Sequence, residues 1–306
     1  MPSFNYGGQA VLEGVMMRGE HDWAVAVRDP EGKIVVRREP LTAAVYRSRA
    51  LKLPFVRGLT SLWDSLGLGL NALLWSADVS LEEEGESLSG PMAWGTMAVS
   101  LALGLGLFML LPAFLSGLAD KHITSNLASN LLEGAIRLAL LVGYMAVIGR
   151  MPEIRRVFAY HGAEHKTINA YEAGAELTPE AVSAHSRAHT RCGTGFLLGV
   201  VVIMVLLTTL LGRPPLLTRL ATRLLLIPVV AGIAYELLKL EARFYDQSAL
   251  VRVLAAPGLA LQRLTTREPD DEMLKVAIAA LETVLASEGL GPEPDGLLLH
   301  EATPVP

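Results

Sequence analysis

Residues 92–118 read MAWGTMAVSLALGLGLFMLLPAFLSGL, and these 27 consecutive residues carry no charged side chain. A helix needs about 20 apolar residues to cross a bilayer, so this segment predicts a membrane span with some tilt. Residues 194–212 form a second uncharged run, of 19 residues. The whole chain is 51% hydrophobic and 19% charged, which is more apolar than an ordinary soluble domain. We therefore expect a mainly α membrane protein.

Two further apolar blocks contain charged residues but are long enough to cross a membrane. Residues 127–149 include Glu133 and Arg137, and residues 220–238 include Arg223 near one end. A bilayer tolerates such charges when they are paired or lie close to its surface. The four blocks together predict about four transmembrane helices.

The charges inside these blocks have two interpretations. Glu133 and Arg137 are four residues apart, so on a helix they share one face and can neutralise each other. Alternatively, both lie near the outer interface and extend their charged groups into water. Arg219 and Arg223 are expected to extend to the interface in that way, and Pro228 is expected to kink its helix locally.

The basic residues predict the orientation of the chain. Nine Lys and Arg residues precede the first span, and six lie between residues 150 and 193. The two other connections are short and contain Lys121 and Arg213. Because basic segments stay in the cytoplasm, both termini and the long connection are expected there. The first residues lack a basic and then apolar pattern, so no cleavable signal peptide is expected.

Residues 1–52 predict a small β-rich cytosolic unit. WAVAVRDPEGKIVVRRE, residues 23–39, has a hairpin pattern in which Trp23, Val25 and Val27 are expected to face Ile34 and Val36. The preceding GGQAVLEGVMMRG, residues 7–19, contains four glycines. This density predicts positive φ angles or close approach of backbones.

The remaining soluble segments are predicted to be mostly helical. Residues 53–90 predict an amphipathic helix, lying on the inner membrane face or packed on the bundle, and then an acidic linker. The spans fill residues 91–150 and 194–240, with a cytosolic His-rich loop at 151–193 between them. Residues 241–288 predict a helical C-terminal region in the cytosol, and 289–306 a disordered tail. The last helix is expected to begin after an Asp270 or Asp271 cap and to bury one apolar face, made of Leu274, Ala277, Ile278, Leu281 and Leu285.

The loop between the second and third spans contains a metal-binding pattern. HGAEH, residues 161–165, places His161 and His165 four residues apart, so on a helix both imidazoles project from one face. Glu164 flanks that face. This order of residues is that of inverted zinc-hydrolase motifs, in which the glutamate is the general base. We expect zinc here, although another divalent metal fits the same ligands.

A tetrahedral site needs a third ligand and, when closed, a fourth. Four candidates follow in the sequence: His189, Cys192, Glu172 and, at lower rank, His185. Three protein ligands plus water make a catalytic site. Closure by His161, His165, His189 and Cys192 makes a structural site, and a third alternative is that the loop binds no metal. Spacing alone leaves the three alternatives open.

Four longer motifs occur in the order YGGQAVLEGVMMRG, AYHGAEHKTINAYE, HTRCGTGFLL and LVRVLAAPGLALQRLTTREPDDEM. With these motifs the chain resembles the bacterial YqhQ-like family over nearly its whole length. Members of this family of unknown function are multi-pass membrane proteins that carry the label of metal-dependent enzymes. The motifs of the family match His161, Glu164, His165, Glu172, His189, Arg191 and Cys192. The resemblance implies a bacterial inner-membrane location.

Two functions from different classes fit these observations. The first is a metal-dependent hydrolase at the cytosolic membrane face, with Glu164 as base and Arg191 stabilising negative charge. Beside the two histidines of HGAEH, His189 or Glu172 is expected to complete its metal site. The second is a non-enzymatic membrane scaffold or assembly factor with a structural metal site, which Cys192 as a ligand favours because its thiolate takes the position that water would need. The expected partners are the lipid bilayer and a peptide, lipid or membrane protein. The net charge of −5 gives no reason to expect nucleic acid.

Overall fold

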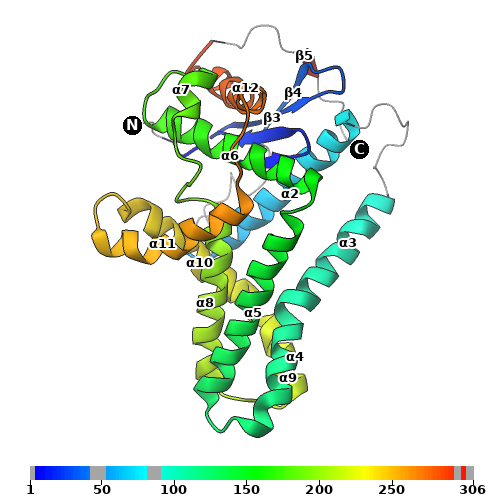
Figure 1. The fold of residues 1–306 in the computed structure, drawn as a ribbon, viewed down its shortest axis with the longest axis vertical. Coiled ribbons are helices and arrows are strands. Elements are labelled where there is room, and N and C mark those ends of the chain that lie inside the picture. The colour runs from blue at the N-terminus through cyan, green and yellow to red at the C-terminus, as the bar shows by residue number, and fades with distance from the viewer. Residues whose placement is uncertain (1–3, 42–52, 81–90, 293–297, 301–306) are drawn as a thin grey trace.

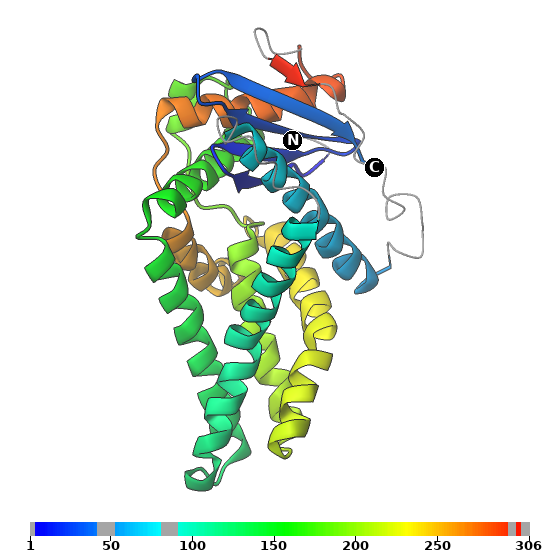
Figure 2. The ribbon, with the colours of Figure 1, turned by 90° about the vertical axis from the view of Figure 1, so that its right-hand side faces the viewer.

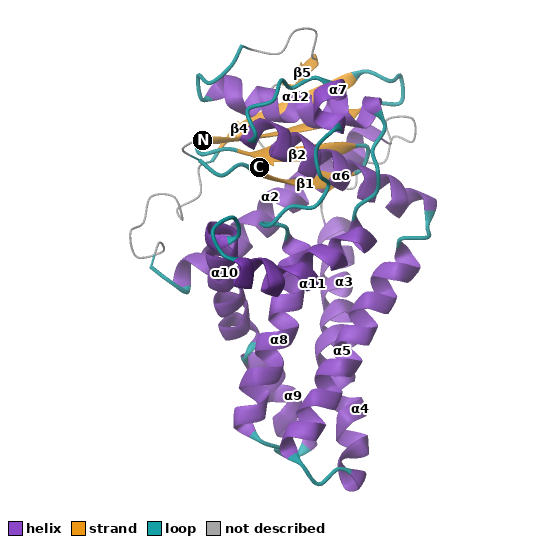
Figure 3. Ribbon diagram, turned by 60° about the vertical axis from the view of Figure 1, so that its left-hand side comes forward, coloured by secondary structure: helices purple, strands orange, loops and turns teal. Residues whose placement is uncertain are grey.

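The computed structural model describes residues 4–41, 53–80, 91–292 and 298–300. Within these ranges the chain is mostly helical, with one small sheet. Figure 1 shows a long bundle of helices, the stalk, below a unit in which helices cover the sheet, the head. Figure 3 shows the strands confined to the head. The predicted acidic linker lies outside the described residues.

The head contains a five-stranded sheet in the order β1-β2-β3-β4-β5. Strands β1 (Gly7–Val11), β2 (Gly14–Arg18), β3 (Asp22–Arg28) and β4 (Ile34–Pro40) form an antiparallel meander. Strand β5 (Leu298–His300) adds in parallel beside β4. The prediction of a disordered tail is therefore wrong for residues 298–300, where backbone pairing with β4 orders the chain.

Both faces of the sheet are buried, which changes the predicted pairing of the hairpin. Val27 pairs with Val35, and Ala26 pairs with Val36. Trp23, Val25 and Val27 therefore share a face with Val35, while Val36 lies on the opposite face with Ala24 and Ala26. The predicted facing of Ile34 and Val36 was wrong because apolar residues occupy both faces, so their alternation does not identify one inner side.

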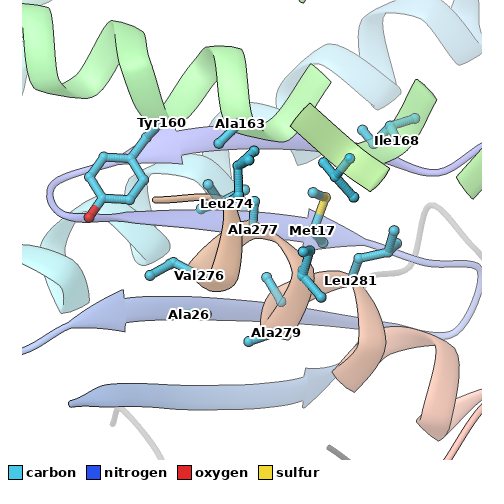
Figure 4. Close-up of a cluster of buried hydrophobic side chains, with 14 of the residues drawn as sticks. Met17, Ala26, Tyr160, Ala163, Ile168, Leu274, Val276, Ala277, Ala279 and Leu281 are labelled. Atoms are coloured by element: carbon cyan, nitrogen blue, oxygen red, sulfur yellow. The ribbon is translucent and has the colours of Figure 1, made fainter. Parts of the chain in front are cut away.

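Helices distant in the sequence cover one face of the sheet. Helix α6 (Pro152–Glu172), the short α7 (Pro179–Ser183) and α12 (Asp271–Ser287) contribute to a shared apolar core with the strands. Figure 4 shows Leu274, Ala277 and Leu281 of α12 over the strands, beside α6. The predicted apolar face of α12 is confirmed, and Asp270 is its cap, accepting a hydrogen bond from the N–H of Met273 at 2.8 Å.

Helix α2 (Val56–Ser80) covers the other face of the sheet. Ala72 and Val79 pack into the core that contains Trp23. Figure 2 shows this helix running beneath the strands. Its outward residues include Trp63, which is 80% exposed. The prediction of a helix in this segment is confirmed. The side that packs on the sheet consists mostly of small residues, while large apolar residues such as Trp63 and Leu66 stay exposed.

The stalk contains the apolar helices. Three described helical segments are long and apolar enough to cross a membrane: Gly95–His122, Asn126–Ile148 and Gly193–Leu211. They comprise α3 (Pro91–Leu105), η2 (Gly106–Leu110), α4 (Leu111–Ala119) and η3 (Asp120–His122), then α5 (Asn126–Ile148) and α8 (Gly193–Leu211). Helices α9 (Leu216–Leu225) and α10 (Ile227–Phe244) count as a fourth if taken together, and the two are bent by 45°. The bend lies beside Pro228, as predicted.

A buried ionic network connects the stalk helices. Glu133 lies 3.0 Å from Arg137 and 2.8 Å from Arg223, and all three side chains are almost fully buried. Arg219 is also buried and pairs with Asp120 at 2.7 Å. The predicted Glu133–Arg137 pair is confirmed. The predicted extension of Arg219 and Arg223 to the interface is wrong because acidic partners on other helices hold both inside the bundle.

Helix α11 (Ala249–Thr265) lies where the stalk meets the head and packs against α8 and α5. The carbonyl oxygen of Thr265, its last residue, lies 2.9 Å from His161 Nδ1 on α6. This helix and α12 form the helical C-terminal region that the sequence predicts.

Candidate metal centre

Helix α6 carries the HGAEH residues through the interior of the head. Proline at its first position suits a helix start, since proline has no N–H to leave unsatisfied. Gly162 allows close packing, because an added Cβ would lie 2.1 Å from the carbonyl oxygen of Arg267. Glu164 and His165 are both buried, which is expensive for polar groups unless they are partnered.

One side of α6 fixes the segment that returns to α8. Lys166 Nζ donates to the Ser183 carbonyl at 2.7 Å, and Asn169 Nδ2 donates to the Ser186 carbonyl at 2.6 Å. His165 Nδ1 lies 2.6 Å from the Arg187 carbonyl. These hydrogen bonds determine where the chain arrives at Cys192.

The two histidines of α6 are held in one tautomer. His161 Nδ1 lies 2.9 Å from the carbonyl oxygen of Thr265, at the end of α11. A carbonyl oxygen only accepts, so in both His161 and His165 the Nδ1 atom carries a proton, and in the neutral ring the lone pair is on Nε2. Such hydrogen bonds from Nδ1 to backbone carbonyls typically orient metal-ligating histidines.

Cys192 completes a group of three candidate ligands. One ligand atom each from His161, His165 and Cys192 lies within 4.8 Å of the others. Cys192 caps α8, with the N–H of Thr194 donating to its sulfur at 3.4 Å. The distance from His161 Nε2 to Cys192 Sγ is 3.4 Å. A tetrahedral zinc with ordinary bond lengths separates a nitrogen and a sulfur ligand by about 3.5 Å.

Glu164 lies beside this group, on the same helix. Burial raises the pKa of its carboxyl to about 7, while the charge of His161 and a hydrogen bond from the backbone N–H of Gly8 act in the opposite direction. Strand β1 approaches closely here, and a Cβ on Gly8 would lie 3.0 Å from Glu164 Cγ and 2.5 Å from the Met16 carbonyl oxygen. The glycine-rich motif therefore serves close backbone approach, and Gly8 keeps an ordinary negative φ.

His189, Glu172 and Arg191 form a neighbouring group. Arg191 pairs with Glu172 and also donates to the Tyr6 carbonyl at 3.2 Å. Burial raises the pKa of Glu172, but His189 and Arg191 together bring it below its ordinary value. His189 Nε2 is buried without a hydrogen-bond partner, 3.8 Å from Glu172. The structure thus brings His161, His165 and Cys192 together and places His189 and Glu172 beside them.

Two cavities meet at the cluster. One of about 750 Å³ extends into the stalk, and one of about 780 Å³ lies between the head and α10. His161, Glu164 and Cys192 line both. A ligand in either cavity therefore reaches the same reactive groups.

Several positioning groups were not identified as such from the sequence. The Thr265 carbonyl orients His161, and the Gln262 side chain forms hydrogen bonds with both backbone groups of His189, at 2.9 and 2.8 Å. Gly8 donates its backbone N–H to the carboxyl of Glu164. These residues lie in the YGGQ and LQRLTT motifs, whose positions beside the histidines only the tertiary structure reveals.

Comparison with known proteins gives the family. A family profile described as "Protein of unknown function (DUF1385)" matches residues 53–287. The chain is 37% identical over 298 residues to the "Uncharacterized protein YqhQ" of Bacillus subtilis (strain 168), covering 93% of both chains. No solved structure matches significantly. The chain belongs to the DUF1385 family of proteins of unknown function.

Proposed function

We propose that this protein is a metal-dependent hydrolase in a bacterial inner membrane, with its site at the cytosolic face. The observation that carries the proposal is the convergence of two oriented imidazoles and one thiol at a point where two cavities meet, beside a buried carboxylate. Three ligands leave a coordination position, and the cavities give a substrate access to it. The stalk would lie in the bilayer, and the excess of basic residues favours a cytoplasmic head.

The residues fit a zinc ion. Both Nδ1 atoms are occupied by backbone carbonyls, so the two Nε2 atoms are available as ligands. The nitrogen-to-sulfur distance of 3.4 Å matches tetrahedral coordination. Zinc prefers this mixture of imidazole and thiolate, whereas magnesium and calcium prefer oxygen ligands. His161, His165 and Cys192 would hold the ion.

A bound zinc ion supplies Lewis acidity, which lowers the pKa of water and polarises a substrate oxygen. Glu164 accepts the proton of the attacking water and passes it to the leaving atom, which is an oxygen in an ester or phosphodiester and a nitrogen in a peptide. The water oxygen joins the acyl or phosphoryl centre as the old bond breaks, so the products together contain one added water. Arg191 lines the cavity beside Cys192 and offers positive charge to a developing oxyanion.

A structural metal site is the second candidate, and one observation favours it. The buried Nε2 atom of His189 has no hydrogen-bond partner, and the rings of His189 and His165 are 5.5 Å apart. A small shift would make His189 a fourth ligand and close the site, as expected for a scaffold or assembly factor. The geometry favours the open site because Gln262 holds the backbone of His189 on both sides.

The experiment compares the wild type with Glu164→Gln. Full-length protein is purified with zinc, reconstituted into vesicles of phosphatidylethanolamine and phosphatidylglycerol, and tested on these lipids and on labelled casein. We expect Glu164→Gln to retain zinc by elemental analysis and to lose turnover by the about 100- to 10,000-fold typical of general-base removal. Glu176→Gln, at an exposed position of the head, is the matched control. Unchanged turnover by zinc-loaded Glu164→Gln would contradict the mechanism.

A further inference from the structure

The two cavities at the cluster differ sharply in character. The cavity in the stalk is lined mostly by apolar side chains of α3, η2, α5 and α8, including Leu105, Phe108, Leu141 and Val201. The cavity below the head is lined by five basic residues, namely Arg18, Arg57, Arg191, Lys239 and Arg243, and by two acidic ones, Glu164 and Glu236. A ligand that fills both must be amphiphilic, with an anionic end.

The apolar cavity reaches the outer surface of the stalk. Leu101 on α3 and Tyr144 on α5 both line it, yet they are 59% and 46% exposed. Helix α3 also packs loosely, because only 11% of the most apolar window in its candidate span is buried. Figure 1 shows α3 standing apart from α5 along the upper stalk. A ligand would thus enter this cavity sideways, between two helices proposed to lie in the bilayer.

The basic cavity has cations available for an anionic group. Arg57 pairs with Glu236, and Arg191 with Glu172. In the described part of the chain, Lys239 and Arg243 form no ion pair, and both are exposed at the cavity on α10. An anionic headgroup placed here would gain their charge without displacing an existing carboxylate.

Resting on the proposed hydrolase, we propose that the substrate is an anionic glycerolipid. Its acyl chains lie in the apolar cavity, and its headgroup lies against Lys239 and Arg243. The ester or phosphodiester bonds between these parts lie beside His161, Glu164 and Cys192, where the two cavities meet. Hydrolysis there adds one water across one of these bonds.

The test measures lipid occupancy, which is independent of turnover. Full-length protein in detergent is incubated with equal amounts of dioleoyl phosphatidylglycerol and dioleoyl phosphatidylcholine, and retained lipid is measured by mass spectrometry after size exclusion. The wild type is expected to retain phosphatidylglycerol preferentially. Removing both cations, by Lys239→Gln with Arg243→Gln, should reduce this preference about 25-fold, at about fivefold per cation. Arg252→Gln with Arg263→Gln, at exposed positions of α11, is the charge-matched control.

A second variant tests the apolar cavity. Gly104 lines it, and an added Cβ would meet nothing within 4 Å, so Gly104→Phe introduces a ring at the cavity wall from an open position. Gly143 has equally open surroundings on α5 but does not line the cavity, so Gly143→Phe is the control. Gly104→Phe should lower retention of both lipids several-fold while Gly143→Phe does not. Gly104→Leu, a smaller change, repeats the test if the first variant is unstable.

Three outcomes would overturn the inference: equal retention of the two lipids, a preference that survives loss of both cations, or equal retention by the two phenylalanine variants. Displacement of lipid by an anionic apolar peptide at lower concentration than by phosphatidylglycerol itself would assign the cavities to a peptide instead. The assay is repeated on zinc-free protein. Failure to bind zinc would overturn the hydrolase and leave lipid retention intact, so the two proposals fail separately.

Discussion

Replacing Glu133 with glutamine removes the carboxylate that two buried arginines share. Both of its oxygens accept hydrogen bonds, one from Arg137 at 3.0 Å and from Arg223 Nε at 2.9 Å, the other from Arg223 at 2.8 Å. The variant leaves two guanidinium charges inside the stalk with a neutral partner. Breaking a buried ion pair from one side costs about 3–5 kcal/mol. At about 1.4 kcal/mol per factor of ten, the unfolding equilibrium shifts by two to four orders of magnitude.

Replacing the basic partner, by Arg223→Gln, is expected to lower the free energy of unfolding by less. Arg223→Gln leaves Glu133 and Arg137 as a neutral pair, whereas Glu133→Gln leaves two uncompensated guanidinium charges. Both variants are unfolded with sodium dodecyl sulfate in mixed micelles and followed by tryptophan fluorescence, beside Glu176→Gln as an exposed control. The reasoning would be refuted if Glu133→Gln changed the free energy of unfolding by no more than about 1 kcal/mol relative to the control, which is the range of an exposed ion pair. A larger decrease for Arg223→Gln than for Glu133→Gln would also refute it.

Three further changes test the head by the same unfolding measurement. Leu281→Ala removes a fully buried side chain from the core between the sheet and α12 and should lower the free energy of unfolding by about 2–5 kcal/mol. A decrease below about 1 kcal/mol would mean that this core is loosely packed. Asp270→Ala removes the cap of α12 and should cost about 1 kcal/mol, with Asp271→Ala nearly neutral. Gly8→Ala places a Cβ 2.5 Å from the Met16 carbonyl and should cost about 1–3 kcal/mol. No loss there would show that β1 shifts freely.

The stalk and α12 follow from local sequence. An uncharged run such as 92–118 identifies a helix by its length and composition, and the cap before α12 lies next to the apolar face that it precedes. These properties depend on neighbouring residues alone, so they can be predicted without knowledge of the fold. Pro228 and the 45° bend beside it follow the same logic.

Features that depend on distant partners did not follow from the sequence. Arg223 resembles an interfacial residue until Glu133, 90 positions earlier, is seen to lie 2.8 Å from it. The hairpin register was misjudged because Ala26 and Val27 are both buried, on opposite faces. Residues 298–300 resemble a tail until β4 offers an edge for pairing.

The candidate site likewise has a local part that the sequence predicts and a part that depends on tertiary structure. The pairing of His161 with His165 is local and needs only helical spacing. The sequence predicts His189 or Glu172 as the third ligand of an open site and Cys192 as the ligand that closes a structural one. The true arrangement depends on how α6 holds residues 183–188. The tertiary structure places one ligand atom of Cys192 within 4.8 Å of one from each imidazole of α6, and it pairs Glu172 with Arg191.

The most direct test of the central claim is the coordination of zinc in the purified full-length protein, measured by X-ray absorption and elemental analysis. We predict one zinc per chain, bound by two imidazole nitrogens, one sulfur and one light atom that is not from a side chain. Cys192→Ser should remove the sulfur scattering, and His189→Ala should leave the spectrum unchanged. Four protein ligands that include His189 would contradict the open site and favour the scaffold, and absence of zinc would contradict the metal centre altogether.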